Sequence, residues 1–155
     1  MLNLALLAPV PEEHLVAGRE CCLVNGSVAF GSRDFEVFRQ LDAQLSGAPC
    51  DVLIYASWPL TPVSGPPAVT WIATYLRTVD ARLDGSPPPG IFRPSSTEKY
   101  PGDSKGHWAV YWEVTHLAPL PKEAHLRVHT LRGLASSKRY LKTFRPERPL
   151  IISAP

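Results

Sequence analysis

The residues best suited to line a binding pocket gather around one turn, within the segment from Cys50 to Asp80. Apolar residues alternate along 52–57 as they do in a buried or half-buried strand, Trp58-Pro59 ends that pattern, and a second apolar run follows over 68–79. The turn between the runs is rich in proline and glycine, with aromatic and small polar side chains around it. Aromatic faces beside hydrogen-bonding groups at the end of a strand pair predict a lined pocket rather than a plain hairpin.

The candidate catalytic residues form a less specific pattern than the candidate pocket residues. An enzyme needs a nucleophile with a base, paired carboxylates or a metal, and the best metal set is His116, His125 and His129. On an extended strand, His125 and His129 would lie on one face but too far apart to share an ion. Glu113 with Lys105 or Lys122 offers acid-base chemistry as an alternative. We predict no catalytic residues, no metal site and no cofactor, and keep a hydrolase as the rival hypothesis.

The composition indicates one folded domain that covers residues 1–155. A chain of 155 residues with 45% hydrophobic and 19% charged residues can bury a core without disulfides. Its 17 prolines favour short elements and many loops, so we predict an α+β fold rich in strands with a few short helices. The cysteines at 21, 22 and 50 are odd in number and lack a CxxC spacing, which argues against a disulfide framework or a zinc site.

Charge is distributed unevenly along the chain. Residues 1–90 carry five Lys or Arg and nine Asp or Glu, whereas residues 91–155 carry eleven and five, so the net charges are −4 and +6. A basic C-terminal part can bind a polyanion such as nucleic acid. The alternative is that these cations are ordinary solvated surface residues.

Periodicity and turn signals predict the following order of elements. Strands are expected at 2–8, 21–24, 28–30, 50–57, 68–79, 107–117, 126–128 and 149–153, and helices after Ser32 up to Gly47 and over 131–141. Asn25-Gly26 is typical of a type I′ turn, which would join 21–24 and 28–30 as a hairpin. In 107–117, alternation places Trp108, Val110, Trp112 and Val114 on the core face.

A long segment without periodicity, residues 84–106, separates the strand pair from the strand at 107–117. Loops of this length inside a compact domain are often functional. Its cations Arg93, Lys99 and Lys105, with Phe92 and Tyr100, could fold over a ligand. The alternative is that this segment is a surface loop that contacts no ligand.

The first residues are apolar, but they lack a basic start and reach Pro9 and Pro11 before a signal-peptide core is complete. No run approaches the ~20 apolar residues that a membrane helix needs. We therefore expect a cytoplasmic protein without a membrane partner.

The order of motifs resembles the PUA-like superfamily, and within it the EVE domains, which are related to ASCH and YTH domains. The features that carry the resemblance are an N-terminal strand, a helix, a strand with the pattern Leu53-Ile54-Tyr55-Ala56-Ser57, a strand with Ile72-Ala73-Thr74, a strand that begins at Trp108 and a closing apolar strand. The likeness covers most of 50–153 and only loosely 1–49. Cys50-Asp51 stands where those families carry Gly-Asp, Trp71 stands where many carry glycine, and the GxKxxExR signature of ASCH proteins is absent.

The resemblance implies a small mixed β-barrel that binds DNA or RNA, in some members through a modified base flipped into an aromatic pocket. Stacking on aromatic side chains would restore about 1–3 kcal/mol per base. The residues that it implies for the base pocket are Asp51, Tyr55, Ser57, Trp58, Thr70, Trp71 and Trp112. For the phosphates the basic part offers Arg93, Lys99, Lys105, Arg132, Lys138, Arg139, Lys142 and Arg145. A reader of this kind would act with an effector protein.

Three alternatives stay open beside this interpretation. Trp71 and Trp112 lie in predicted strands, where tryptophan usually belongs to the core. The resemblance also leaves open an ASCH-like hydrolase that acts on a nucleoside or RNA. The chain could instead be a protein-interaction module without a small ligand, in which case an exposed apolar patch would replace the pocket.

Overall fold

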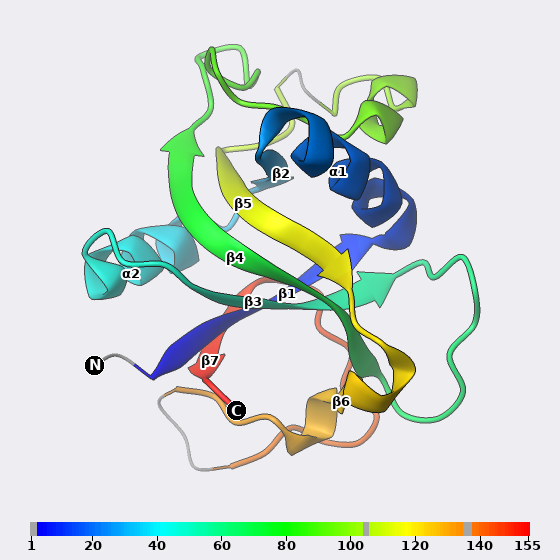
Figure 1. Ribbon diagram of the computed structural model, residues 1–155. Helices are drawn as coiled ribbons and strands as arrows, with labels where there is room; N and C mark the ends of the chain where they lie inside the picture. Colours follow the sequence, from blue (N-terminus) through cyan, green and yellow to red (C-terminus); the bar gives the residue numbers. More distant parts are fainter. Residues whose placement is uncertain (1–2, 104–105, 135–137) are drawn as a thin grey trace.

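The computed structural model describes residues 3–103, 106–134 and 138–155, and these residues form an α+β fold, as predicted (Figure 1). Two short helices, α1 (Glu12–Asn25) and α2 (Phe35–Leu45), accompany one mixed sheet of seven strands. The strands are β1 (Leu4–Pro11), β2 (Val28–Ser32), β3 (Cys50–Ser57), β4 (Ala68–Asp80), β5 (Val110–Pro119), β6 (Leu126–Arg127) and β7 (Leu150–Ser153).

The sheet follows the order β2-β5-β4-β3-β1-β7, and β6 pairs with β4 beside that path. β1 pairs with β3 in parallel, and all other ladders are antiparallel. Within the described parts of the chain, no ladder joins the edge strands β2 and β7, so the sheet stays open. The prediction of a mixed β structure is confirmed, whereas closure into a barrel is not shown.

β1 has apolar cores on both of its faces. Leu4, Leu6 and Ala8 belong to the larger hydrophobic cluster, which lies against α1 and α2. Ala5 and Leu7 point to the opposite face and belong to a smaller cluster with residues of the C-terminal segment. A strand that is buried on both faces appears as a continuous apolar run, which is what residues 4–8 show.

The predicted hairpin at 21–30 is wrong, because its first half belongs to α1. Gly26 adopts φ +88° and donates its N–H to the Cys22 carbonyl at 2.7 Å, so it ends the helix instead of forming a turn between two strands. Asn-Gly suits both roles, since both need a left-handed residue. The buried residues Leu15, Gly18 and Cys22 follow helical spacing on the inner face.

A second prediction, the helix over 131–141, is also wrong for the residues that the structure describes there. Arg132 and Arg139 form an antiparallel bridge, and Gly133 bridges Ile152 of β7. Phe144 and Tyr140 stack at 4.7 Å beside the smaller core cluster. The apolar residues of this segment therefore cover the sheet as extended chain, and no helical face is needed.

Other predicted elements are confirmed. α2 follows Ser32 and ends at Ser46, which has φ +49° and donates its N–H to the Asp42 carbonyl at 3.0 Å. β3 and β4 are an antiparallel pair, and β5 places Val110, Trp112 and Val114 in the larger core. The predicted start of that strand is wrong, because β5 begins only at Val110, and Trp108 lies before it, half-buried and outside the core cluster. The long loop after β4 contains one 3₁₀ helix, Ser95–Lys99, which lies against α1. No helix among the described residues combines the length and apolar character needed to span a membrane.

Candidate functional site

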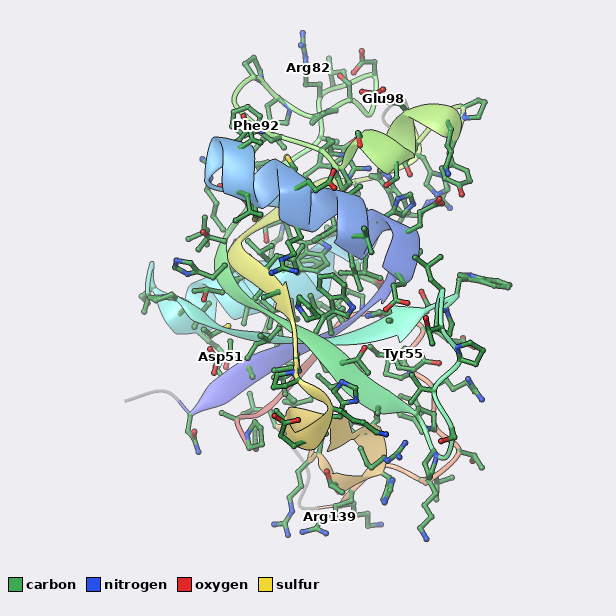
Figure 2. All side chains as sticks on the ribbon, turned by 45° about the vertical axis from the view of Figure 1, so that its right-hand side comes forward. Asp51, Tyr55, Arg82, Phe92, Glu98 and Arg139 are labelled. Atoms are coloured by element: carbon green, nitrogen blue, oxygen red, sulfur yellow. The ribbon has the colours of Figure 1, made fainter. Side chains whose placement is uncertain are left out.

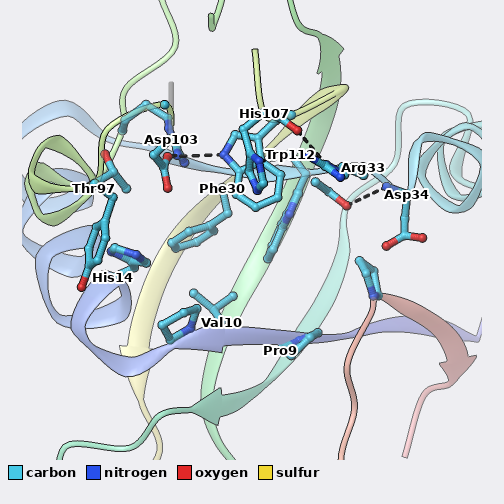
Figure 3. A pocket seen from close by; sticks show the side chains of 18 of the residues that line it. Pro9, Val10, His14, Phe30, Arg33, Asp34, Thr97, Asp103, His107 and Trp112 are labelled. Carbon is cyan, nitrogen blue, oxygen red and sulfur yellow. Dashed lines mark hydrogen bonds and ion pairs between the residues drawn. The ribbon is translucent and has the colours of Figure 1, made fainter. Parts of the chain in front are cut away.

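The large cavity, of about 720 Å³, lies where the end of β1, the start of α1 and β2 meet the long loop (Figure 3). Pro9 and Val10 of β1 form one side of it, and Phe30, Trp112 and His107 lie opposite. This volume can hold a nucleoside-sized ligand, because cavities for small ligands typically measure about 300–1,000 Å³.

Aromatic side chains dominate the cavity wall. The rings of Trp112 and Phe30 lie 5.0 Å apart, and Trp112 also stacks on Phe38 at 5.8 Å, so this wall is continuous with the core. Trp108 crosses the backbone of Gly31 so closely that a Cβ there would lie 2.3 Å from the indole ring. The absence of a side chain at Gly31 therefore permits the position of Trp108.

Asp103 is one of three acidic residues that line the cavity, with Asp34 and Glu147. It accepts hydrogen bonds from the Trp108 indole Nε1 at 3.3 Å and from the Arg93 guanidinium, with which it forms an ion pair. The side chains of Arg93 and Asp103 are only 11% and 14% exposed, and burial lowers the pKa of Arg93 while the Asp103 charge opposes this. Arg93 also donates to the Ala29 carbonyl at 2.8 Å. Asp103 is thus fixed in place by a buried partner.

His14 lies on the opposite end of the cavity from Arg33 (Figure 3). Its Nδ1 is 2.6 Å from the Ser96 hydroxyl, and its ring meets Tyr100 edge-on at 5.5 Å. Burial lowers the pKa of His14 despite the nearby Asp103 charge, so the ring is neutral at pH 7. Neutral imidazole offers one donor and one acceptor, and can therefore hydrogen-bond a neutral ligand.

His107 and Arg33 complete the rim next to Trp108. Arg33 donates from Nε to the His107 carbonyl at 2.9 Å, and its Nη2 lies 3.1 Å from the His107 ring nitrogen Nδ1. The His107 ring meets Trp108 at 4.1 Å in an edge-on arrangement. These contacts hold the segment before β5 against the start of α2 and so stabilise this part of the cavity wall.

A second cavity, about 320 Å³, lies beneath the loop between β3 and β4. Four of the residues predicted from sequence line it: Tyr55, Thr70, Trp71 and Arg145. Arg145 donates to the Tyr55 hydroxyl at 3.1 Å, and the Trp71 indole donates to Glu12 at 3.2 Å. The expected pocket at this turn therefore exists, although the predicted base-binding residues do not all meet there.

The other predicted base-binding residues lie elsewhere. Trp112 lines the large cavity. Asp51 is exposed at the opposite end of β3 from Tyr55 (Figure 2). Ser57 is half-buried, and Trp58 is 84% exposed with φ +48°; neither lines either cavity. The predicted set thus divides between two cavities and the surface.

The residues predicted to bind phosphate form two groups. Arg93 is buried in its ion pair, and Lys99 forms an exposed ion pair with Glu13 at 2.5 Å; Lys105 lies outside the described residues. The C-terminal group is exposed and comprises Arg132, Lys138, Arg139, Lys142 and Arg145. Arg139 lies at the far end of the molecule from the loop that bears Arg82 and Glu98 (Figure 2).

The residues proposed for catalysis do not meet in a cavity. The Glu113 carboxylate accepts from Arg77 at 3.0 Å and from Ser27 at 3.2 Å, and it lines neither cavity. The His125 ring nitrogen Nε2 contacts the Leu120 carbonyl at 3.1 Å. In the described part of the chain, no group of three or more His, Cys, Asp or Glu side chains could hold a metal ion.

The sequence analysis missed His14, Phe30, Asp103 and the role of Trp108. His14 lies in a segment for which no helix was predicted, and Asp103 lies in the aperiodic loop. The available signal was the loop itself, whose length and aromatic content indicated a functional segment. The sequence matches no protein-family model and shows no significant match to a curated protein.

Proposed function

We propose that this protein is a nucleic-acid-binding domain that accepts one flipped base in the large cavity. The resemblance to PUA-like domains implies base binding of this kind but at a set of residues of which only Trp112 lines this cavity. The observation that carries the proposal is the combination of aromatic walls with fixed polar groups in one cavity of about 720 Å³. A flipped base needs a stacking surface and hydrogen-bonding partners at its edge. Trp108 offers the former, and Asp103 and His14 offer the latter.

The polar groups suit an uncharged base better than a phosphate. Asp103 is an acceptor fixed by Arg93 and Trp108, so it can receive a hydrogen bond from an exocyclic amine. The Arg93 charge is balanced by Asp103, and His14 is neutral, so the interior holds little net positive charge. Phosphates would instead meet exposed cations outside the cavity.

Arg33 is exposed and lines the large cavity, so it is the cation placed to meet a phosphate beside an inserted base. The exposed C-terminal cations do not line that cavity, and Arg139 lies at the far end of the molecule from the long loop, so they would meet only more distant phosphates of a longer strand (Figure 2). Arg132, Arg139 and Lys142 are exposed in a segment whose net charge is positive. Binding through such a surface weakens as salt rises, because contacts with phosphates release counterions. Contacts with the 2′-hydroxyl distinguish RNA from DNA, and contacts at the base edge distinguish a modified base from an unmodified one.

The test is a fluorescence titration with short DNA and RNA oligonucleotides, unmodified or carrying methylated adenine or cytosine, at two salt concentrations. Trp108→Ala should weaken binding by about tenfold or more, because stacking contributes about 1–3 kcal/mol per base. Trp58→Ala is the matched control, since Trp58 is 84% exposed and lines neither cavity.

Each result of this titration has a defined meaning. Loss of binding in Trp108→Ala alone supports insertion into the large cavity. Loss in Trp58→Ala alone would show that bases stack on the surface, and the cavity proposal would be wrong. Failure of every oligonucleotide to bind at low salt would reject nucleic acid as the partner.

A further inference from the structure

We propose that the second cavity, under the β3–β4 loop, binds a small carboxylate with an apolar body and a hydrogen-bonding group at its far end. Tyr55 and Trp71 form aromatic parts of its wall, and prolines of the loop form much of the rest. No lining residue is shared with the large cavity, so this proposal does not depend on the proposed function.

The loop that covers this cavity is held in place at both ends. Near its start, the Leu60 N–H donates to Glu12 Oε1 at 2.8 Å, while Glu12 Oε2 receives the Trp71 indole. Near its end, Arg127 donates to the Ser64 carbonyl at 3.2 Å and to the Pro66 carbonyl. Prolines at 59, 62, 66 and 67 further restrict the backbone. A cavity built this way requires little ordering when a ligand binds.

Thr70 lines the cavity and carries a buried hydroxyl without a hydrogen-bond partner. The β3–β4 register shifts here, since Ile54 pairs with Trp71 and Tyr55 with Val69, so Thr70 is the extra residue of a β-bulge. Bulges often re-aim side chains beside binding sites. Thr70 is only 8% exposed, lines the cavity, and its hydroxyl has no hydrogen-bond partner in the structure. A buried hydroxyl without a partner gains a hydrogen bond when a ligand atom reaches it, and no existing bond has to be broken.

Arg145 supplies a positive charge at the mouth. It is exposed yet lines the cavity, and its Nη1 donates to the Tyr55 hydroxyl. Both carboxylate oxygens of Glu12 already accept hydrogen bonds from the protein. An anionic group on a ligand therefore finds its partner in Arg145, and guanidinium matches carboxylate geometry well.

The positions of these groups define the ligand. A buried hydroxyl inside, an apolar wall and an exposed guanidinium outside fit a molecule with one polar atom, an apolar body and a terminal carboxylate. The cavity of about 320 Å³ suits a small ligand of roughly ten non-hydrogen atoms. We use 4-hydroxybenzoate as the probe, because it has this order of groups.

The experiment is an NMR titration of the full chain with three probes: 4-hydroxybenzoate, benzoate and 4-hydroxybenzamide. Shifts of the Trp71 indole N–H and the Leu60 amide report binding in this cavity, and dissociation constants of about 1–10 mM are expected for such fragments. Thr70→Val should weaken 4-hydroxybenzoate by about fivefold and leave benzoate unchanged. Arg145→Gln should weaken both carboxylates by about tenfold and leave the amide unchanged.

Matched controls separate the site from general effects. Thr70→Ser keeps the hydroxyl and should bind 4-hydroxybenzoate as the wild type does. Thr74→Val and Arg139→Gln make the same changes at residues outside the cavity and should leave the affinity for the probes unaltered. Absence of saturable shifts up to about 100 mM probe, tenfold above the weakest dissociation constant expected, would overturn the proposal. Equal binding in wild type, Thr70→Val and Arg145→Gln would overturn it as well.

Discussion

Replacement of Thr70 by valine should make the ligand-free protein more stable. The Thr70 side chain is 8% exposed and its hydroxyl has no hydrogen-bond partner, so folding removes that hydroxyl from water without compensation. Such a loss costs about 1–3 kcal/mol. Valine has nearly the same shape and suits a strand, so the substitution creates no cavity.

We expect the free energy of unfolding to rise by about 1 kcal/mol or more, which corresponds to a Tm increase of about 2–4 °C for a domain of this size. Thermal unfolding and urea titration measure this directly. Thr74→Val serves as the control on the same strand. The Thr74 side chain is half-buried, and its hydroxyl is not one of the buried groups that lack a hydrogen-bond partner. Its effect should be small.

A decrease in stability in Thr70→Val would refute the reasoning, because it would show that a bound water or another group already satisfies the hydroxyl. An unchanged m-value is required for the comparison, since a changed slope would indicate an altered unfolded state. Addition of 4-hydroxybenzoate should raise the Tm of the wild type more than that of the variant, because ligand stabilisation follows affinity.

Three further changes test the large cavity. Gly31→Ala places a Cβ 2.3 Å from the Trp108 ring, so the indole must move. We expect the free energy of unfolding to fall by about 1–3 kcal/mol and the tryptophan emission to change. An emission spectrum identical to that of the wild type would contradict this. Asp103→Asn removes the charge that balances buried Arg93 and should cost about 3–5 kcal/mol in urea unfolding; a cost below 1 kcal/mol would mean that the pair is solvated. Because burial lowers the pKa of His14, the unfolded chain binds a proton at His14 more readily than the folded protein does. The free energy of unfolding should therefore fall as the pH drops below ~6.5, and His14→Gln should reduce that fall. An equally steep pH dependence in both proteins would reject this cause.

Much of the sheet could be predicted from local patterns. Alternation in 107–117 and 50–57 and the continuous apolar run after Asn3 predict strands, because side-chain direction in a strand depends only on position along the chain. α2 lies between Ser32 and Gly47, as local signals predict, although its cap residues are Asp34 and Ser46. These signals failed at Asn25-Gly26, where one dipeptide suits both a hairpin and the end of a helix.

A shared pocket for Tyr55, Thr70 and Trp71 could be predicted from the sequence, since a single loop joins the two strands that carry them. The contribution of Arg145, ninety positions after Tyr55, could not, because it depends on how the C-terminal segment packs against β3. The large cavity was beyond local inference for the same reason. His14, Gly31 and Asp103 lie on separate elements, and they meet because α1 and the long loop both pack beside β2, which no periodicity along the chain encodes.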